Sequence, residues 1–198
     1  MGGKREKKVI GNYDSEKNND VVNNNVVKGV KHPLNNSWSF WMFTNKKSVW
    51  EENLIKLTTF DTVEDYWSLY HHMKCPSGLD LGQEYAIFKD DIRPMWEDKA
   101  NKFGGRWVIN LEKTQNSDLD AVWLYVVLLL IGNNFENSDA ICGAVVNIRQ
   151  KSKIGIWISD SRNKKAIDEI GRKLKFNLSL QSKINFHAHN SNKNIFTL

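Results

Sequence analysis

The sequence contains few cysteines, and neither lies in the pattern of a metal site. Cys75 and Cys142 are the only two in 198 residues, without the Cys-x-x-Cys spacing or nearby histidines that bind zinc. Separate thiols of this kind are typical of a cytosolic protein whose cysteines stay reduced. We therefore expect no metal and no cofactor.

A long hydrophobic run is also missing. The longest aliphatic run, residues 126–131, is too short to cross a membrane. Val9 and Ile10 are the only large aliphatic residues near the start of the chain, too few for the core of a signal peptide. These absences predict a cytoplasmic protein that does not bind a membrane.

The body of the chain lacks the positive charge of a protein that coats nucleic acid. Of the formal net charge of +5, residues 1–31 carry +3 from seven basic and four acidic side chains, which leaves +2 for residues 32–198. An anion site must then be a local cluster of cations. The dense array of acids that a metal-dependent hydrolase needs is absent too, and Glu97 with Asp98 is insufficient. We expect no enzymatic activity.

Residues 1–31 form a tail rich in Asn and Lys, with Tyr13 as its one aromatic residue. Such a segment cannot bury enough apolar surface to offset the entropy of ordering it, so we predict that it is disordered. Residues 32–198 suffice for one hydrophobic core, and we expect them to form a single monomeric domain.

Three segments of this domain have helical patterns. Residues 61–73 and 117–133 each begin with a capping box, and a third helix is predicted at residues 163–175. The two boxes consist of Asp61 with Glu64 and of Ser117 with Asp120. The third helix should bury Ala166, Ile167, Ile170 and Leu174.

Other segments have the patterns of strands. Residues 37–43 are rich in aromatic side chains, and residues 106–113 alternate between apolar and polar ones. Residues 143–159 alternate across a tight turn near Ser152, which predicts a hairpin. Its period-2 geometry places on one face Asn147, Arg149, Lys151, Lys153 and Trp157. Strand groups followed by helices predict an α+β fold, with helices on one face of an antiparallel sheet and a ligand on the other.

Two tryptophans lie where no core pattern predicts them. Trp50 is in a polar segment, and Trp96 follows Pro94 in a predicted loop, directly before Glu97. With the hairpin cations, they would offer flat aromatic surfaces, a carboxylate and positive charge to a ligand with a cationic ring, N–H donors and phosphates. Each part also has a simpler explanation: an apolar plug under a loop, a solvated acid or a solvated hairpin end.

From His32 to Leu198 the sequence resembles eukaryotic translation initiation factor 4E. The matching stretches are residues 32–34 (HPL), 60–67 (FDTVEDYW), 94–98 (PMWED), 104–107 (GGRW), 117–120 (SDLD) and 142–147 (CGAVVN). The resemblance implies a curved antiparallel sheet with three helices on its convex face and a slot for the mRNA 5′ cap on its concave face. It also implies recruitment of capped mRNA to the translation initiation machinery.

This resemblance assigns a role to each residue of the slot. The 7-methylguanine ring would lie between Trp50 and Trp96, with Glu97 accepting from the guanine edge. The backbone N–H of Trp96 would meet O6, and Trp157 would contact the N7-methyl group. The cations assigned to the phosphates are Arg149, Lys151, Lys153 and Arg106.

A second site is implied on the helical face, for a scaffold of the initiation factor 4G type or for 4E-binding repressors. Both would carry a Tyr-x-x-x-x-Leu motif followed by an apolar residue. The matching residues here are His32, Pro33, Leu34, Val63, Trp67, Leu124 and Leu128. Core packing would explain the four helical ones equally well. Tyr125 stands where the family commonly has an acid, and the family's longer C-terminal loop with a regulatory serine is not seen after His189.

Three other functions fit parts of the pattern. They are a hydrolase of capped RNA, a general single-stranded RNA module that stacks bases on aromatic side chains, and a cap-binding repressor that recruits no scaffold. Repressing branches of the family often replace Trp38 or Trp50 with another aromatic residue. Both are Trp here, which favours a general initiation factor.

Overall fold

The computed structural model describes residues 29–111, 116–191 and 194–198, with side chains from residue 119 onward in the second range. Met1–Val30 and Lys31–Leu198 form separate units, and every element below belongs to the second. The predicted disordered tail falls largely outside the described residues and remains a prediction. Within the described ranges, no helix is long and apolar enough to cross a membrane.

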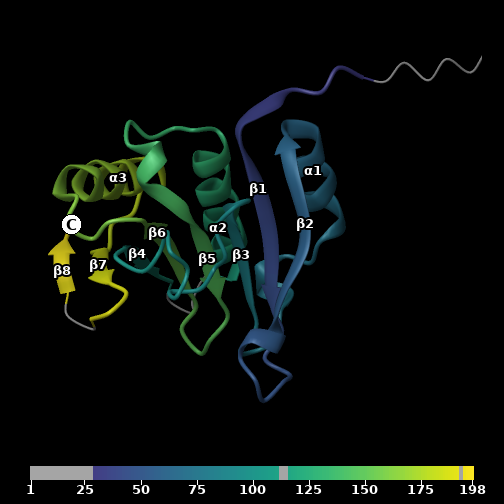
Figure 1. Ribbon diagram of the computed structural model, residues 1–198, viewed down its shortest axis with the longest axis horizontal. Coiled ribbons are helices and arrows are strands. Elements are labelled where there is room, and N and C mark those ends of the chain that lie inside the picture. Colours follow the sequence, from purple (N-terminus) through teal and green to yellow (C-terminus); the bar gives the residue numbers. More distant parts are fainter. Residues whose placement is uncertain (1–28, 112–115, 192–193) are drawn as a thin grey trace, which may run out of the picture. The chain divides into compact units, whose positions relative to one another are not determined.

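Eight strands form one sheet in the order β2-β1-β3-β5-β6-β4-β7-β8, and all neighbours are antiparallel. The strands are β1 Pro33–Phe43, β2 Leu54–Thr62, β3 Glu84–Lys89, β4 Gly105–Asn110, β5 Ile141–Asn147, β6 Lys153–Ile158, β7 Asn185–Ala188 and β8 Asn194–Thr197. Figure 1 shows β2 and β8 at opposite edges of this sheet.

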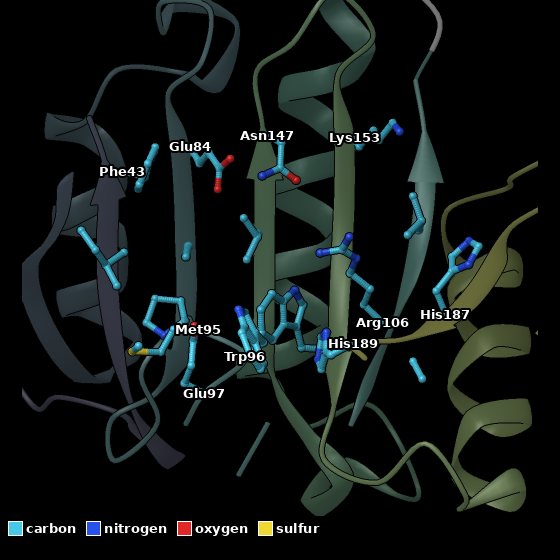
Figure 2. A pocket seen from close by; sticks show the side chains of 18 of the residues that line it. Phe43, Glu84, Met95, Trp96, Glu97, Arg106, Asn147, Lys153, His187 and His189 are labelled. Atoms are coloured by element: carbon cyan, nitrogen blue, oxygen red, sulfur yellow. The ribbon is translucent and has the colours of Figure 1, made fainter. Parts of the chain in front are cut away.

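Three α-helices and three short 3-10 turns connect the strands. The helices are α1 Val63–His72, α2 Asn116–Ile131 and α3 Lys164–Asn177, and the turns are η1 Glu51–Asn53, η2 Pro76–Gly78 and η3 Ser138–Ala140. Seen from the pocket side, the helices lie behind the strands (Figure 2). The predicted fold class, an antiparallel sheet with three helices on one face, is confirmed.

The main core fills the space between the sheet and the helices. Alternate residues of the central strands, such as Trp107 and Ile156, are fully buried there against Ile170 of α3. The Trp107 indole N–H donates to the backbone oxygen of Ile167 at 3.0 Å. A Cβ atom at Gly171 would come within 2.4 Å of the Trp107 ring, so only glycine allows this close approach.

The helix predictions hold, with one correction at a helix start. The N-cap of α1 is Thr62 and not Asp61: the Thr62 hydroxyl accepts from the backbone N–H of Asp65 and donates to its carboxylate at 2.7 Å. In α3 the four residues predicted to be buried are buried. The Ser117 side chain lies outside the described residues, and Asp120 accepts instead from the backbone N–H of Ser77 at 2.8 Å.

Candidate ligand-binding pocket

The face of the sheet opposite the helices carries a cavity of about 610 Å³. Five strands supply its floor through alternate residues, and Figure 2 shows side chains rising from the sheet, among them those of Glu84, Asn147 and Lys153. The floor residues are Glu84 and Ala86 of β3, Val145 and Asn147 of β5, Lys153, Gly155 and Trp157 of β6, Arg106, Val108 and Asn110 of β4, and Asn185 and His187 of β7. The period-2 alternation of the sequence therefore determines which residues face the cavity.

Trp50 and Trp96 line the cavity from two separate loops. All eight tryptophans lie in the described part of the chain, and only these two are exposed, Trp50 by 43% and Trp96 by 58%. The alternative of an apolar plug under a loop does not fit such exposure. Large apolar side chains are seldom left exposed to water unless they belong to a binding site. The two exposed indoles therefore indicate that the cavity binds a ligand.

The loop of Trp50 is held in place by the buried side chain of Asn53. Its amide oxygen accepts from the backbone N–H groups of Lys46 and Lys47, both at 2.7 Å. Its amide nitrogen donates to the backbone oxygens of Lys47 at 2.8 Å and Val49 at 2.9 Å. The Trp50 ring also packs 5.4 Å from the ring of Phe43, at the end of β1.

The loop of Trp96 is built around Asp98 and the buried Asn101. The Asp98 carboxylate accepts from the backbone N–H groups of Arg93 at 3.1 Å and Ala100 at 2.9 Å. The Asn101 amide nitrogen donates to the backbone oxygens of Arg93 at 2.9 Å and Met95 at 2.8 Å. This framework places Glu97 on the cavity wall next to Trp96.

The floor between the two loops contains Trp157 and an unexpected histidine. The Trp157 ring is nearly buried, with its centroid 5.4 Å from Phe88 and 4.1 Å from His189. Burial, and to a smaller degree the nearby Arg106 charge, lowers the pKa of His189 to about 4. Its buried Nε2 has no hydrogen-bond partner in the described structure. The ring is therefore neutral near pH 7, which suits a site for a cationic ligand.

His187 and His189 both line the cavity, and neither was anticipated from the sequence. A signal was present, because Asn185, His187 and His189 alternate with buried Phe186 and Ala188 in the period of a strand. The stretch is short and near a chain end, so the alternation alone did not predict a strand.

Four predicted site residues stand on the cation side of the cavity, and the structure separates them into two groups. Lys153 and Arg106 line the cavity, whereas Arg149 and Lys151 do not. The hairpin prediction placed Arg149 and Lys151 on one face with Lys153, and it is wrong at the first two positions. The reason is that β5 ends at Asn147, so strand parity does not extend beyond it.

After β5 the chain lies next to the residues that directly precede β3. Ile148 exchanges backbone hydrogen bonds with Gln83 at 3.0 Å and Gly82 at 2.8 Å. Arg149 then reaches back, and its Nη2 lies 2.6 Å from Oε1 of Glu84, a floor residue. Arg149 is thus at the rim of the cavity, tied to a carboxylate that faces into it.

The residues predicted for the second site lie on the helical side. Val63 N–H donates to the His32 backbone oxygen at 2.9 Å, and the His32 ring nitrogen lies 2.6 Å from the Glu64 carboxylate. Hydrogen bonds from the His32 side chain first, and then from the backbone N–H groups of His32 and Glu64, lower the pKa of Glu64 to about 2. Four of the residues are partly buried against the main core: Leu34, Trp67, Leu124 and Leu128. Val63 is exposed, so this surface combines core packing with open apolar area.

The chain is similar to known proteins over most of its length. A family model described as Eukaryotic initiation factor 4E matches residues 33–195. Eukaryotic translation initiation factor 4E1 of Drosophila melanogaster is 57% identical over 152 residues, which cover 76% of this chain and 59% of the fly protein. Eukaryotic translation initiation factor 4E of Bos taurus is 50% identical over 174 residues, which cover 86% of this chain and 79% of the bovine protein.

A solved structure shows the same fold. The complex of C. elegans eIF4E-3 with the 4E-binding protein Mextli and a cap analog superposes with a TM-score of 0.80 at 38% identity. The match covers 85% of this chain and 100% of the nematode chain.

Proposed function

The chain belongs to the eukaryotic initiation factor 4E family, and on that premise we propose that it binds the 7-methylguanosine 5′ cap of mRNA in the pocket described above. The family is non-enzymatic, and no catalytic step is proposed. One observation carries the proposal: the only two exposed tryptophans of the chain, Trp50 and Trp96, line one cavity together with a carboxylate and cations.

The methylated base accounts for the aromatic and acidic side chains. A 7-methylguanine ring carries a delocalised positive charge, which is attracted to the faces of Trp50 and Trp96. Its N1–H and N2–H₂ groups can both donate to the Glu97 carboxylate, while the Trp96 backbone N–H meets O6. Trp157, on the floor, would contact the N7-methyl group, and neutral His189 behind it adds no repelling charge.

The triphosphate accounts for the cations. Lys153 and Arg106 already line the cavity. Arg149 and Lys151 would join them from the rim, and Arg149 would first exchange Glu84 for a phosphate. Such an exchange costs little, because an exposed ion pair contributes only about 0–1 kcal/mol.

The helical face would bind a protein partner. We propose that Trp67, Val63 and the other residues of the second site bind a scaffold of the 4G type or a repressor with a Tyr-x-x-x-x-Leu motif, and that the chain acts as a monomer in the cytoplasm. The support is the apolar area left open there and the 4E-binding protein present in the similar nematode structure. Tyr125, 58% exposed on α2, would not supply the usual acid to a basic residue of the partner.

Titration with 7-methyl-GTP, followed by tryptophan fluorescence, tests the cap site. We expect quenching and saturation with 7-methyl-GTP and much weaker binding of GTP, because only the methylated base is cationic. Equal affinity for both nucleotides would contradict cap binding and favour a general single-stranded RNA module. Capped RNA should survive incubation with Mg²⁺; its hydrolysis would indicate a decapping enzyme.

A Trp67→Ala variant tests the second site. We expect this variant to lose its binding of a Tyr-x-x-x-x-Leu peptide, while its cap affinity and melting temperature stay close to those of the parent. A large fall in melting temperature with loss of cap binding would show that Trp67 is a core residue. Failure of the parent protein itself to bind the peptide would favour a repressor that recruits no scaffold.

A further inference from the structure

The chain path brings the C-terminal end of α3 to the end of the sheet that carries Lys153, on the face opposite the pocket. β6 runs from Lys153 to Ile158, away from that end, and α3 follows it and returns. β4 fixes the destination, because it pairs Asn110 with Lys153 and Val108 with Asn185, the first residue of β7. The last turn of α3, and the loop from it into β7, therefore lie at the end of the sheet where the phosphates are proposed to bind.

This segment is the basic part of the domain. Residues 160–183 hold seven basic and three acidic side chains, a net charge of +4. Residues 32–198 carry +2 in total, so the rest of the domain has a net charge of −2. The positive charge is thus concentrated on α3 and its flanks, and it is not a general property of the surface.

The acids of the segment do not neutralise its lysines. Asp160 pairs with Arg162, and Asp168 pairs with Arg172. Glu169 points to the neighbouring loop, where its carboxylate accepts from backbone N–H groups, the nearer at 3.1 Å. Among the described residues, no ion pair involves Lys173, Lys175 or Lys183.

The same segment also contains an exposed aromatic residue. Phe176, in the last turn of α3, is 84% exposed. The helix ends there because Ser179 takes a left-handed conformation, with φ of 49°, and the N–H of Leu180 bonds the oxygen of Lys175 at 3.0 Å. Phe176 is thus exposed directly after Lys175 in the chain, and the loop that follows α3 leads to Lys183.

Exposed aromatic rings among lysines are the components of a sequence-tolerant binding surface for single-stranded nucleic acid. We propose that Lys175, Phe176 and Lys183 bind the RNA chain that follows the cap, the lysines through phosphates and Phe176 by stacking on a base. The inference rests on the proposed function, since it requires the cap phosphates at Lys153. Neighbouring strands are only about 5 Å apart, and the RNA would pass around the end of the sheet to reach α3 on the other face.

The test compares 7-methyl-GTP with a short, unstructured, capped oligonucleotide on the full chain. The parent should bind the oligonucleotide at least about fivefold more tightly, the lower end of what one stacked base contributes. Phe176→Ala and the pair Lys175→Gln with Lys183→Gln should each reduce this advantage. The lysine pair should also lower the slope of log affinity against log salt by about 0.7 per lysine. None of them should change the affinity for 7-methyl-GTP.

The matched control is the pair Lys164→Gln with Lys165→Gln. It removes the same charge at the other end of α3, about 16 Å from Lys175. If this pair loses as much oligonucleotide affinity as the Lys175 and Lys183 pair, the effect comes from the overall positive charge, and the assigned site is wrong. The site is also wrong if the parent binds the oligonucleotide and 7-methyl-GTP with equal affinity. Absence of 7-methyl-GTP binding would instead contradict the proposed function. Retention of the advantage in Phe176→Ala, with loss in the lysine pair, would overturn the stacking contact.

Discussion

The two loops that carry Trp50 and Trp96 are organised by the same residue type, one buried asparagine each. Asn53 is 2% exposed and Asn101 is fully buried. In the Trp50 loop, every hydrogen-bonding group of the Asn53 amide has a backbone partner. In the Trp96 loop, the Asn101 nitrogen has two partners, but its buried oxygen has none among the described residues.

We infer from this difference that the two walls of the pocket differ in stiffness. A buried acceptor without a partner costs about 1–3 kcal/mol, so a shift that brings a donor to it is favourable. The Asn53 amide has no such deficit, and movement of its loop would break bonds. We therefore expect the wall of Trp96 and Glu97 to adjust on ligand binding and the wall of Trp50 to stay fixed.

The largest effect is expected beneath both walls, at His189. Its pKa is lowered from 6.5 to about 4 by burial, so its stabilising contribution is complete above pH 6.5 and is lost as the pH falls toward 4. The free energy of unfolding should drop by about 3 kcal/mol over this range. Urea titrations at both pH values measure it, and His189→Gln should show a smaller drop. An equal drop in the variant would assign the acid sensitivity to other groups.

The next effect concerns the two indoles themselves. Trp50→Ala or Trp96→Ala should weaken 7-methyl-GTP binding at least about tenfold, since each stacking contact contributes roughly 1–3 kcal/mol. Fluorescence titration measures the affinity, and circular dichroism checks that the fold is intact. If only one of the two variants loses affinity, the ligand stacks on one wall and the sandwich is wrong.

The asparagines test the stiffness comparison directly. Asn53→Ala removes four backbone contacts and Asn101→Ala removes two, while Asn101→Ala also removes the unmatched oxygen. We expect Asn53→Ala to lower the free energy of unfolding by about 1–2 kcal/mol and Asn101→Ala by less. Asn53→Asp is the control, since it keeps the acceptor but loses the donors. A larger loss at Asn101 would reverse the assignment of the rigid wall.

The smallest effect is expected at the rim. Arg149→Gln with Lys151→Gln should reduce 7-methyl-GTP affinity several-fold and lower the salt slope by up to about 0.7 per cation. Lys164→Gln with Lys165→Gln provides the comparison of equal charge away from the pocket. If the slope of log affinity against log salt is the same in the parent and in the rim variant, Lys153 and Arg106 alone bind the phosphates.

Much of the fold was predictable because period-2 and helical patterns of apolar residues indicate which face of each strand or helix is buried. The alternation at Arg106, Asn147, Lys153 and Trp157 predicted the pocket floor correctly. It was wrong at Arg149 and Lys151, because alternation in a sequence does not show where a strand ends. The helix start was misplaced by one residue, since Asp61 and Thr62 are both good N-caps and only the structure distinguishes them.

Other parts of the site could not be predicted from local pattern. Asn53 and Asn101 look like many other asparagines in an Asn-rich chain, and their burial depends on the loops that fold around them. His189 meets Trp157 only because β7 pairs with β4, which in turn pairs with β6. Contacts across three strands leave no trace in the spacing of the residues. The roles of all these residues in binding remain predictions.

The strand order has a consequence for synthesis of the protein. Among the described strands, β4 pairs with β6 and β7, which both follow it in the chain, and with none that precedes it. During synthesis on the ribosome, β4, with its apolar residues Trp107 and Ile109, therefore has no strand to pair with until residues beyond 153 have emerged. Such an unpaired strand in a nascent chain is prone to aggregation. We expect chaperones that act on nascent chains to protect it during this interval.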